Sequence, residues 1–307
     1  MDDEMLYLNG RFMPLSEGRI GVEDRGFQLG DGVYEVIKVM NGRLLWLEDH
    51  LERLLRSLEA VRLRGALEGS APEQFLPDLV GRSGVTHGIV YVQVTRGPAP
   101  REFVFPDPPH ATVLAYVRTK RAPEVSEILA GAILHPVEDQ RWARCDIKST
   151  NLLAAVLAKE AAREAGADEA LFLGPEGVVR EGGSSNVFAV FEDTIRTHPL
   201  DNRILAGITR RHVLEIARRS GYLVEERPFA LEEVTAAANG SAARFGCEVF
   251  ISSTTRDIQP VVRIGPYVVG DGRPGAVTLA LLDVMRREQA VSVGLPPPAA
   301  LASPGLR

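Results

Sequence analysis

The chain has 307 residues, of which 45% are hydrophobic and 25% charged, so it is long enough for one large or two medium domains with buried cores. Its formal net charge of −6 leaves no basic surplus for phosphate backbones or anionic lipid. No stretch has the length of a membrane span, and the N-terminus opens on acidic residues rather than on a basic, signal-like segment. We therefore expect no nucleic-acid or membrane partner.

Cysteine usage indicates the compartment. Cys145 and Cys247 lack CxxC spacing and are too few for a disulfide framework. Two such cysteines suit reducing conditions, so we expect a cytoplasmic protein. We also expect no metal site.

The first part of the chain predicts strands and hairpins. Residues 33–40 are β-branched and aromatic, which favours a strand. Asn41-Gly42 is the signal of a type I′ hairpin turn, so residues 43–47 should return as the partner strand.

The next segment predicts a helix over residues 48–61. Its apolar face consists of residues at helical spacing: Leu51, Leu54, Leu55, Leu58 and Val61. Arg53 falls on the opposite side, which we expect to be exposed. Two more strands are expected at residues 88–97 and 111–118, with a proline-rich loop between them.

The second part mixes helices and strands. Helices are expected over residues 151–166, 207–221 and 275–288, the second of them stopped by Gly221. The expected strands lie in five segments: residues 169–174, 178–191, 194–199, 247–255 and 259–269.

Both halves therefore predict α+β-like domains of a mixed α/β fold class rather than a doubly wound sheet. The expected division is a small N-terminal domain, a linker, a larger C-terminal domain and a disordered tail: residues 1–120, 121–128, 129–292 and 293–307.

Lys148 stands where a polar connection gives way to an apolar helix. A lysine amine costs several kcal/mol to strip of water, so a lysine near an interior either extends its amine to solvent or takes part in chemistry. Most lysines are solvated, and only partners elsewhere in the chain can change that interpretation.

Such partners follow in the run REGGSSNVF. Glu181 is a carboxylate, the two glycines after it let the backbone approach a ligand closely, and Ser184 and Ser185 supply short donors and acceptors. A plain turn between strands explains the glycines but not the density of polar groups.

A phosphate site is indicated by three further segments. Ile208 and Thr209 open a helix, whose free N–H groups favour an anion. Thr254 lies among hydroxyls at a strand end, and Arg53 adds a cation. A lysine, a carboxylate and a phosphate cup are the parts that pyridoxal 5′-phosphate needs.

The sequence resembles the fold-type IV aminotransferases that depend on this cofactor, and among them the bacterial D-amino acid (D-alanine) aminotransferases. The runs EDRGFQLGDGVYEVIKV, RWARCDIKSTNLLAAVLAKEA, EGGSSNVF, ILAGITR and FISSTTRDIQPV occur in family order from about residue 20 to residue 290. The resemblance implies a two-domain enzyme, a homodimer, that exchanges an amino group between a small amino donor, such as D-alanine or D-glutamate, and a 2-oxo acid.

The resemblance also assigns roles. Lys148 becomes the Schiff-base lysine, and Glu181 becomes the partner of the pyridine nitrogen. Leu205 packs against the ring, and Tyr34 and Arg101 hold the substrate carboxylate. The implied phosphate ligands are Arg53, Ile208, Thr209 and Thr254.

Two features depart from the family pattern. Phe103 stands where the D-alanine enzymes have a histidine, so one donor to the substrate carboxylate is missing. Residues 236–247 form a longer stretch than expected, which we interpret as a surface insertion.

Several alternatives stay open. Branched-chain L-aminotransferase, aminodeoxychorismate lyase and (R)-amine transaminase share the fold and the cofactor, and Phe103 leaves (R)-amine activity open. A non-catalytic binding protein that kept the fold is the alternative from another class, and the presence of both Lys148 and Glu181 argues against it.

Overall fold

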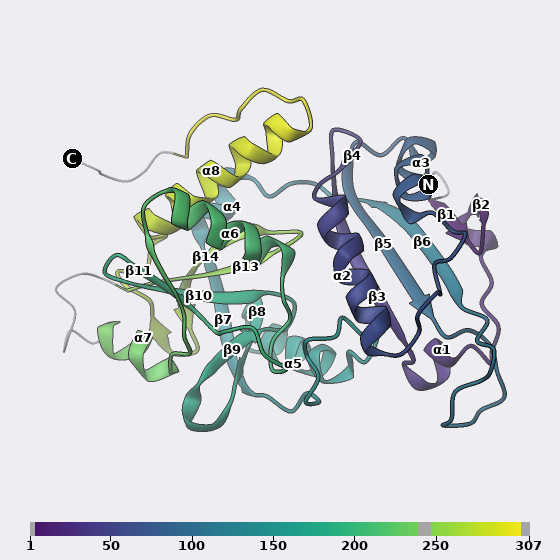
Figure 1. Cartoon of the computed structure of the whole chain (residues 1–307). Coiled ribbons are helices and arrows are strands. Elements are labelled where there is room, and N and C mark those ends of the chain that lie inside the picture. Colours follow the sequence, from purple (N-terminus) through teal and green to yellow (C-terminus); the bar gives the residue numbers. More distant parts are fainter. Residues whose placement is uncertain (1–3, 239–246, 302–307) are drawn as a thin grey trace. The chain divides into compact units, whose positions relative to one another are not determined.

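The computed structural model describes residues 4–238 and 247–301, and the chain divides into two compact units (Figure 1). Unit 1 consists of Met1–Ala122, Ile147–Leu152 and Ser292–Leu295. Unit 2 consists of Pro123–Asp146, Leu153–Val291 and Pro296–Arg307.

Unit 1 is built on a six-stranded antiparallel sheet within the described part of the chain, in the order β2-β1-β6-β5-β3-β4. Its strands are β1 (Met5–Leu8), β2 (Arg11–Pro14), β3 (Gly32–Met40), β4 (Arg43–Leu44), β5 (His87–Thr95) and β6 (Thr112–Thr119). The predicted hairpin is confirmed: Asn41 and Gly42 join β3 to β4 with φ of 52° and 68°, as a type I′ turn requires.

Helices cover one face of this sheet (Figure 1). They are α2 (Leu47–Ala60) and α3 (Pro72–Ser83), while the short α1 (Arg25–Leu29) and the 3₁₀ turn η1 (Leu15–Glu17) precede β3. Val33 and Ile37 lie on the face of β3 that points toward α2 and α3. They pack with Leu54 and Leu79 in a core from which water is excluded.

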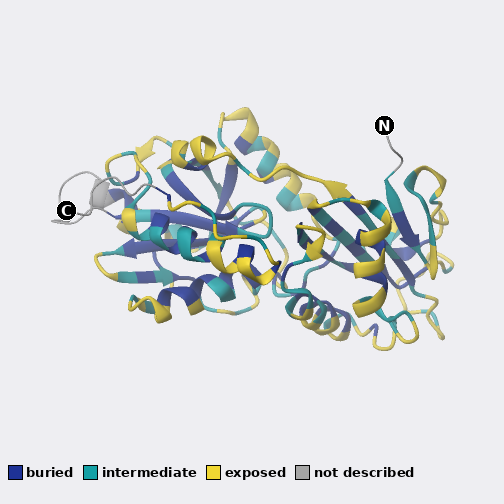
Figure 2. Cartoon of the chain, turned by 90° about the horizontal axis from the view of Figure 1, so that it is seen from above, coloured by how far each residue is buried: buried dark blue, intermediate teal, exposed yellow. Residues whose placement is uncertain are grey.

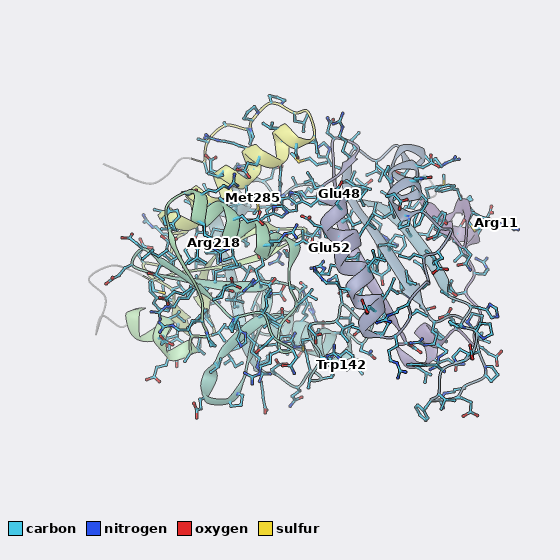
Figure 3. The ribbon with its side chains drawn as sticks, viewed as in Figure 1. Arg11, Glu48, Glu52, Trp142, Arg218 and Met285 are labelled. Carbon is cyan, nitrogen blue, oxygen red and sulfur yellow. The ribbon has the colours of Figure 1, made fainter. Side chains whose placement is uncertain are left out.

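The helix predicted at residues 48–61 is confirmed, but its buried face differs from the expected one. Leu55 is 56% exposed, whereas Arg53 is only 4% exposed. The expectation that Arg53 lies on the exposed side is therefore wrong, because its guanidinium pairs with Glu35 inside the unit. Glu48 and Glu52, labelled in Figure 3, lie on the exposed face of α2.

The segment that carries Lys148 groups with unit 1. The backbone N–H of Tyr34 donates to the carbonyl oxygen of Lys148 (2.9 Å), and that of Thr150 donates to the carbonyl of Gly32 (3.0 Å). The sequence prediction placed Lys148 in the larger C-terminal domain. Backbone pairing with the start of β3, which sequence pattern does not reveal, gives the segment to the N-terminal unit instead.

Unit 2 contains a larger mixed sheet in the order β12-β11-β10-β13-β14-β7-β8-β9, with β15 paired to β14. Its described strands are β7 (Ala132–Glu138), β8 (Glu169–Leu173), β9 (Val179–Gly182), β10 (Asn186–Phe191), β11 (Thr194–Thr197), β12 (Leu223–Glu226), β13 (Glu248–Ser253), β14 (Asp257–Ile264) and β15 (Tyr267–Val268). A further pairing of Glu181 with Asn186 joins β9 to β10 and closes a ring of strands.

The helices of unit 2 are amphipathic. They are α4 (Val125–Ala130), α5 (Leu153–Glu164), α6 (Ile208–Arg219), α7 (Leu231–Ala238) and α8 (Ala276–Ser292), with a 3₁₀ turn, η2 (Pro175–Gly177). On α8, Met285 is fully buried, whereas Arg218 of α6 is half exposed; Figure 3 labels both. In Figure 2 the strands of each unit are largely buried and the helices carry the exposed stretches.

Two predictions concern segments at the edge of the described structure. Residues 302–307 of the tail and residues 239–246 of the expected insertion lie outside the described residues. Leu301, the last described residue of the tail, is packed against the protein, because it is 5% exposed and its N–H donates to Asp283. Among the residues that the structure describes, no helix is long and apolar enough to cross a membrane.

Candidate active site

Lys148 lies in unit 1, half-buried between the buried Ile147 and Ser149. Its Nζ lies 4.3 Å from the centroid of the Tyr34 ring, within range of a cation–π contact. Tyr34 itself stacks on Tyr91 on the sheet face opposite to α2, with centroids 5.6 Å apart. The structure thus brings together two residues that the sequence predicted for cofactor and substrate.

Beneath them, on the core face of β3, lies a buried ionic triad. Glu35 is 0% exposed and accepts hydrogen bonds from Arg53 Nε (2.7 Å) and Nη2 (2.8 Å). His50 Nδ1 lies 2.8 Å from the same carboxylate. An ionised carboxylate only accepts, so Nδ1 carries the proton of this imidazole.

The triad shifts the acidity of its members. Burial would raise the pKa of Glu35, but the Arg53 guanidinium, together with His50, outweighs burial and lowers this pKa to about 2. Burial lowers the pKa of His50, against the opposing effect of Glu35. Glu35 and Arg53 are thus held charged beside a neutral imidazole.

Sequence reasoning did not name Glu35 or His50. A signal was present in the sequence. Glu35 shares the buried face of β3 with Val33 and Ile37, and His50 lies one turn before Arg53 on α2. A charge on a buried face requires a buried partner of opposite sign, and Arg53 is that partner.

The other two predicted substrate residues lie on the long loop between β5 and β6. Arg101 is exposed, and Phe103 is 84% exposed. Among the described residues of unit 1 the Phe103 ring is left largely exposed, and its predicted contact with substrate stays a prediction.

In unit 2, Glu181 occupies the pair that closes the ring of strands. Its carboxylate is buried and accepts from Asn186 Nδ2 (3.2 Å) and from the backbone N–H of Leu205 (3.0 Å). The other carboxylate oxygen lies 2.5 Å from Arg141 Nη1. The structure therefore gathers Glu181 and Leu205, both predicted, with Asn186 and Arg141.

Arg141 was missed by sequence reasoning, although it lies in the run that carries Lys148. Asp139 holds its guanidinium through two hydrogen bonds of 2.9 Å, and Asp139 also accepts from Arg180 (2.7 Å). Burial would raise the pKa of Asp139, but Arg141 and Arg180 lower it. A fixed, always charged Arg141 thus faces Glu181.

Burial still dominates at Glu181. Despite Arg141, it raises the pKa of this carboxyl from 4.5 to about 7. A further cation at the carboxylate would favour its ionised form, so the site is electrostatically suited to a positively charged ligand atom.

The predicted phosphate cup is in part assembled at the start of α6. Gly207 is its N-cap and supplies no side-chain cap, so the first N–H groups, from Ile208 and Thr209, remain available to an anion. A Cβ on Gly207 would lie 2.0 Å from Asn186 Oδ1, so the close approach requires glycine. Thr254 is half-buried in the turn that follows β13.

The two predicted serines behave differently. Ser184 is exposed, and its hydroxyl donates to Glu169 (2.9 Å) and accepts from Lys159 (2.9 Å), so it braces the turn. The Ser185 hydroxyl is buried and has no hydrogen-bond partner among the described residues, and the same holds for Ser252, which pairs with Asn186 in the sheet. An unpartnered buried hydroxyl is costly unless a ligand or water binds it.

Within residues 4–238 and 247–301, no group of three or more His, Cys, Asp or Glu residues could hold a metal ion. The described chemistry consists of a lysine beside an aromatic ring, a buried carboxylate and an uncapped helix N-terminus.

Comparisons with known proteins agree with this chemistry. The family model of amino-transferase class IV matches residues 32–264. The chain is 40% identical over 270 residues to D-alanine aminotransferase of Bacillus licheniformis, which covers 88% of this chain and 92% of that protein. It is 39% identical over 277 residues to D-alanine aminotransferase of Staphylococcus epidermidis, covering 90% and 94%.

Among solved structures, a branched-chain amino acid aminotransferase of T.th., determined with pyridoxamine 5′-phosphate, superposes with a TM-score of 0.81 at 27% identity over 94% of this chain and 95% of that one. The match extends over the mixed α/β fold of both units. The chain therefore belongs to amino-transferase class IV, and it is an aminotransferase of fold type IV.

The Glu35 triad predicts a pH-dependent stability. Because the folded pKa of Glu35 lies below its ordinary value of 4.5, the ion pair stabilises the fold fully above pH 4.5, and this stabilisation is lost as the pH falls toward about 2. Glu35→Gln should lower the free energy of unfolding by about 3 kcal/mol at pH 7. At pH 3.5 the difference from wild type should be smaller by roughly 1 kcal/mol.

Urea unfolding followed by circular dichroism at both pH values measures these differences. Glu59→Gln is the matched control, because Glu59 pairs with Arg64 on the surface and should change stability by less than about 1 kcal/mol. A Glu35→Gln deficit that grows as the pH falls would contradict the assignment.

Proposed function

We propose that this aminotransferase binds pyridoxal 5′-phosphate and transfers the amino group of a D-amino acid, such as D-alanine or D-glutamate, to a 2-oxo acid. The observation that carries the proposal is the 40% identity to a D-alanine aminotransferase over 88% of the chain. The site residues Lys148 and Glu181 support it.

The residues of unit 2 fit the cofactor. The raised pKa of the buried Glu181 suits a carboxylate that gains a cationic partner, which is the protonated ring nitrogen of the cofactor. The uncapped start of α6 suits its phosphate, with Ile208, Thr209 and Thr254 of unit 2 as predicted ligands; the fourth predicted ligand, Arg53, belongs to unit 1. Ser185 offers a buried hydroxyl with no partner among the described residues, and Leu205 would pack against the cofactor ring.

When bound, the cofactor supplies an electron sink that stabilises negative charge at the substrate Cα. Lys148 holds the cofactor through Nζ and then moves the proton at Cα. Glu181 keeps the ring nitrogen protonated, and Arg141, Asn186 and the Leu205 N–H fix the carboxylate for that task.

Substrate orientation falls to the residues that can bind a carboxylate. Arg101 is suited to this role because a guanidinium binds a carboxylate through two parallel hydrogen bonds. The Tyr34 ring, next to Lys148 Nζ, places its phenol on the same side of the sheet as the lysine. Phe103 replaces the histidine of the family pattern and makes the pocket more tolerant of groups that are not carboxylates.

The branched-chain alternative rests on the fold alone, since the D-alanine enzymes are more similar in sequence, at 40% against 27% identity. A second activity toward (R)-amines is favoured by Phe103. The cytoplasmic location stays a prediction.

We also propose a homodimer, with an exposed apolar row on α5 as part of its interface. Leu153, Val156 and Leu157 are 72%, 57% and 63% exposed, and their spacing places them on one helix face. Contiguous exposed apolar surface of this kind favours a second copy of the chain.

Lys148→Ala should abolish transamination of D-alanine with 2-oxoglutarate and remove the visible absorbance of the lysine-bound cofactor. Both effects follow from the loss of the one amine that binds the cofactor and carries the proton. A coupled assay and an absorbance spectrum measure them. Near-normal turnover would disprove the assignment, and wild-type protein that takes up no cofactor would favour the non-catalytic alternative.

Phe103→His should lower KM for D-alanine and reduce activity toward (R)-amines. The regained donor to the substrate carboxylate is worth about 1–3 kcal/mol, which corresponds to roughly fivefold to 150-fold in KM. L-amino acids should remain poor donors, because the proton still arrives on the same face of the cofactor. Phe103→Leu is the control, and unchanged kinetics in Phe103→His would show that residue 103 does not contact the substrate.

Leu157→Glu should weaken the proposed dimer, because it places a charge in the apolar row. Light scattering should show a lower mass at micromolar concentration. Leu223→Glu changes a similarly exposed leucine on β12 and should leave the mass unchanged. A fully active wild-type monomer would refute the dimer.

A further inference from the structure

Two buried arginines of unit 1 share one carboxylate. Asp31 Oδ2 accepts from Arg25 Nε and from Arg96 Nε, both at 2.8 Å, and Arg96 Nη2 lies 3.1 Å from Oδ1. The side chains of Arg25 and Arg96 are 3% and 2% exposed, and that of Asp31 is 13% exposed. None of the three belongs to the residues that touch cofactor or substrate in the proposed function.

The free ends of these guanidiniums reach the loop that carries Arg101. Arg25 Nη1 donates to the carbonyl oxygens of Glu102 (2.5 Å) and Val104 (3.2 Å), the residues on either side of Phe103. The Arg96 guanidinium lies 3.7 Å from the centroid of the Phe105 ring. In Figure 1, α1 and the loop after β5 lie side by side.

The base of the same loop is tied to the segment before α1 by backbone bonds. Arg25 N–H donates to Gly97 (3.0 Å), and Ala99 N–H donates to Glu23 (3.2 Å). Arg101 and Phe103 are themselves exposed, so their own side chains do not fix the loop. The backbone on both sides of them is fixed instead by Arg25.

The cluster also connects the loop to Tyr34. Asp31 stands three residues before Tyr34, and its carbonyl accepts from the Arg96 N–H (3.1 Å) at the end of β5. Arg96 Nη2 further donates to the carbonyl of Val61 (2.7 Å), at the C-terminal end of α2. One buried carboxylate thus joins the start of β3, the end of β5 and the loop.

We propose that Arg25, Asp31 and Arg96 are positioning residues that hold the loop of Arg101 and Phe103 in the conformation that binds the substrate carboxylate. This proposal rests on the carboxylate-binding role of Arg101 in the proposed function. Two buried arginines that share one acid are costly to assemble, and a displacement of about 1 Å at a binding group can cost about a hundredfold in rate, so a rigid support is of use here.

Arg25→Lys is the main variant, because a lysine keeps the charge near Asp31 but its single nitrogen cannot replace both Nε at Asp31 and Nη1 at the two carbonyls. It should raise KM for D-alanine about tenfold and change kcat less than about threefold. In the Arg101→Ala background the same substitution should raise KM for D-alanine by less than a further factor of about two, since its effect acts through Arg101. Amide hydrogen exchange of residues 98–106 in the holoenzyme should become faster.

Phe105→Leu serves as a second variant that carries little risk to folding, because Phe105 is 45% exposed, and it should raise KM in the same direction by about threefold. Arg82→Lys is the control: Arg82 lies 4.4 Å from the Phe12 ring and pairs with Asp78, away from the loop, so KM and loop exchange should stay unchanged.

The outcomes separate this proposal from the function on which it rests. If Arg101→Ala itself leaves KM for D-alanine unchanged, the carboxylate role of Arg101 fails and the positioning role fails with it. If Arg101→Ala raises KM but Arg25→Lys does not, or if the two effects multiply in the double variant, the positioning role alone is overturned.

Discussion

The chemistry of unit 2 depends on one ion pair at the place where its strands close into a ring. Glu181 pairs with Asn186 across the closing strands, and Arg141 is the one cation that reaches its buried carboxylate among the hydrogen bonds described above. Ring closure removes the carboxylate from water, which raises its pKa to about 7, and Arg141 opposes that rise without cancelling it. The same pairing that completes the fold thereby creates a carboxylate whose ionisation responds to a cation in the site.

Unit 1 also contains a buried carboxylate, Glu35, but its pKa is shifted in the opposite direction. Glu35 is as buried as Glu181, yet Arg53 and His50 lower its pKa, whereas burial prevails at Glu181. The difference lies in the geometry: Arg53 forms two hydrogen bonds to Glu35, while Arg141 gives Glu181 one and is otherwise engaged by Asp139. Glu35 stays ionised, its charge is balanced by Arg53, and its role is structural. Glu181 can still accept a further positively charged partner.

Local patterns in the sequence were sufficient for many of the elements and for the chemically distinctive residues, but β1, β2, α3 and β7 were not predicted. The Asn41-Gly42 turn, the helix of Leu54 and Leu58, and the Lys148 and Glu181 motifs all follow from short runs of sequence. The rotation of α2 did not, because Leu55 is exposed and Arg53 is buried in response to Glu35, eighteen residues earlier in the chain.

Arg141 was missed for the same reason, since its partner Glu181 lies forty residues away and nothing local marks the pair. Lys148 was assigned to the wrong side of the domain boundary because its backbone pairs with β3 of the N-terminal unit. These features depend on contacts between segments that are far apart in the chain. The pattern of neighbouring residues in a single sequence does not reveal such contacts.

The central claim is that Glu181 binds and protonates the ring nitrogen of the cofactor. It is tested most directly by the ¹⁵N chemical shift of ring-labelled pyridoxal 5′-phosphate in the holoenzyme and in Glu181→Gln. The account predicts a protonated ring nitrogen in the wild type from pH 6 to pH 9 and an unprotonated one in the variant, because only the carboxylate stabilises the cation. The same shift in both proteins would contradict it.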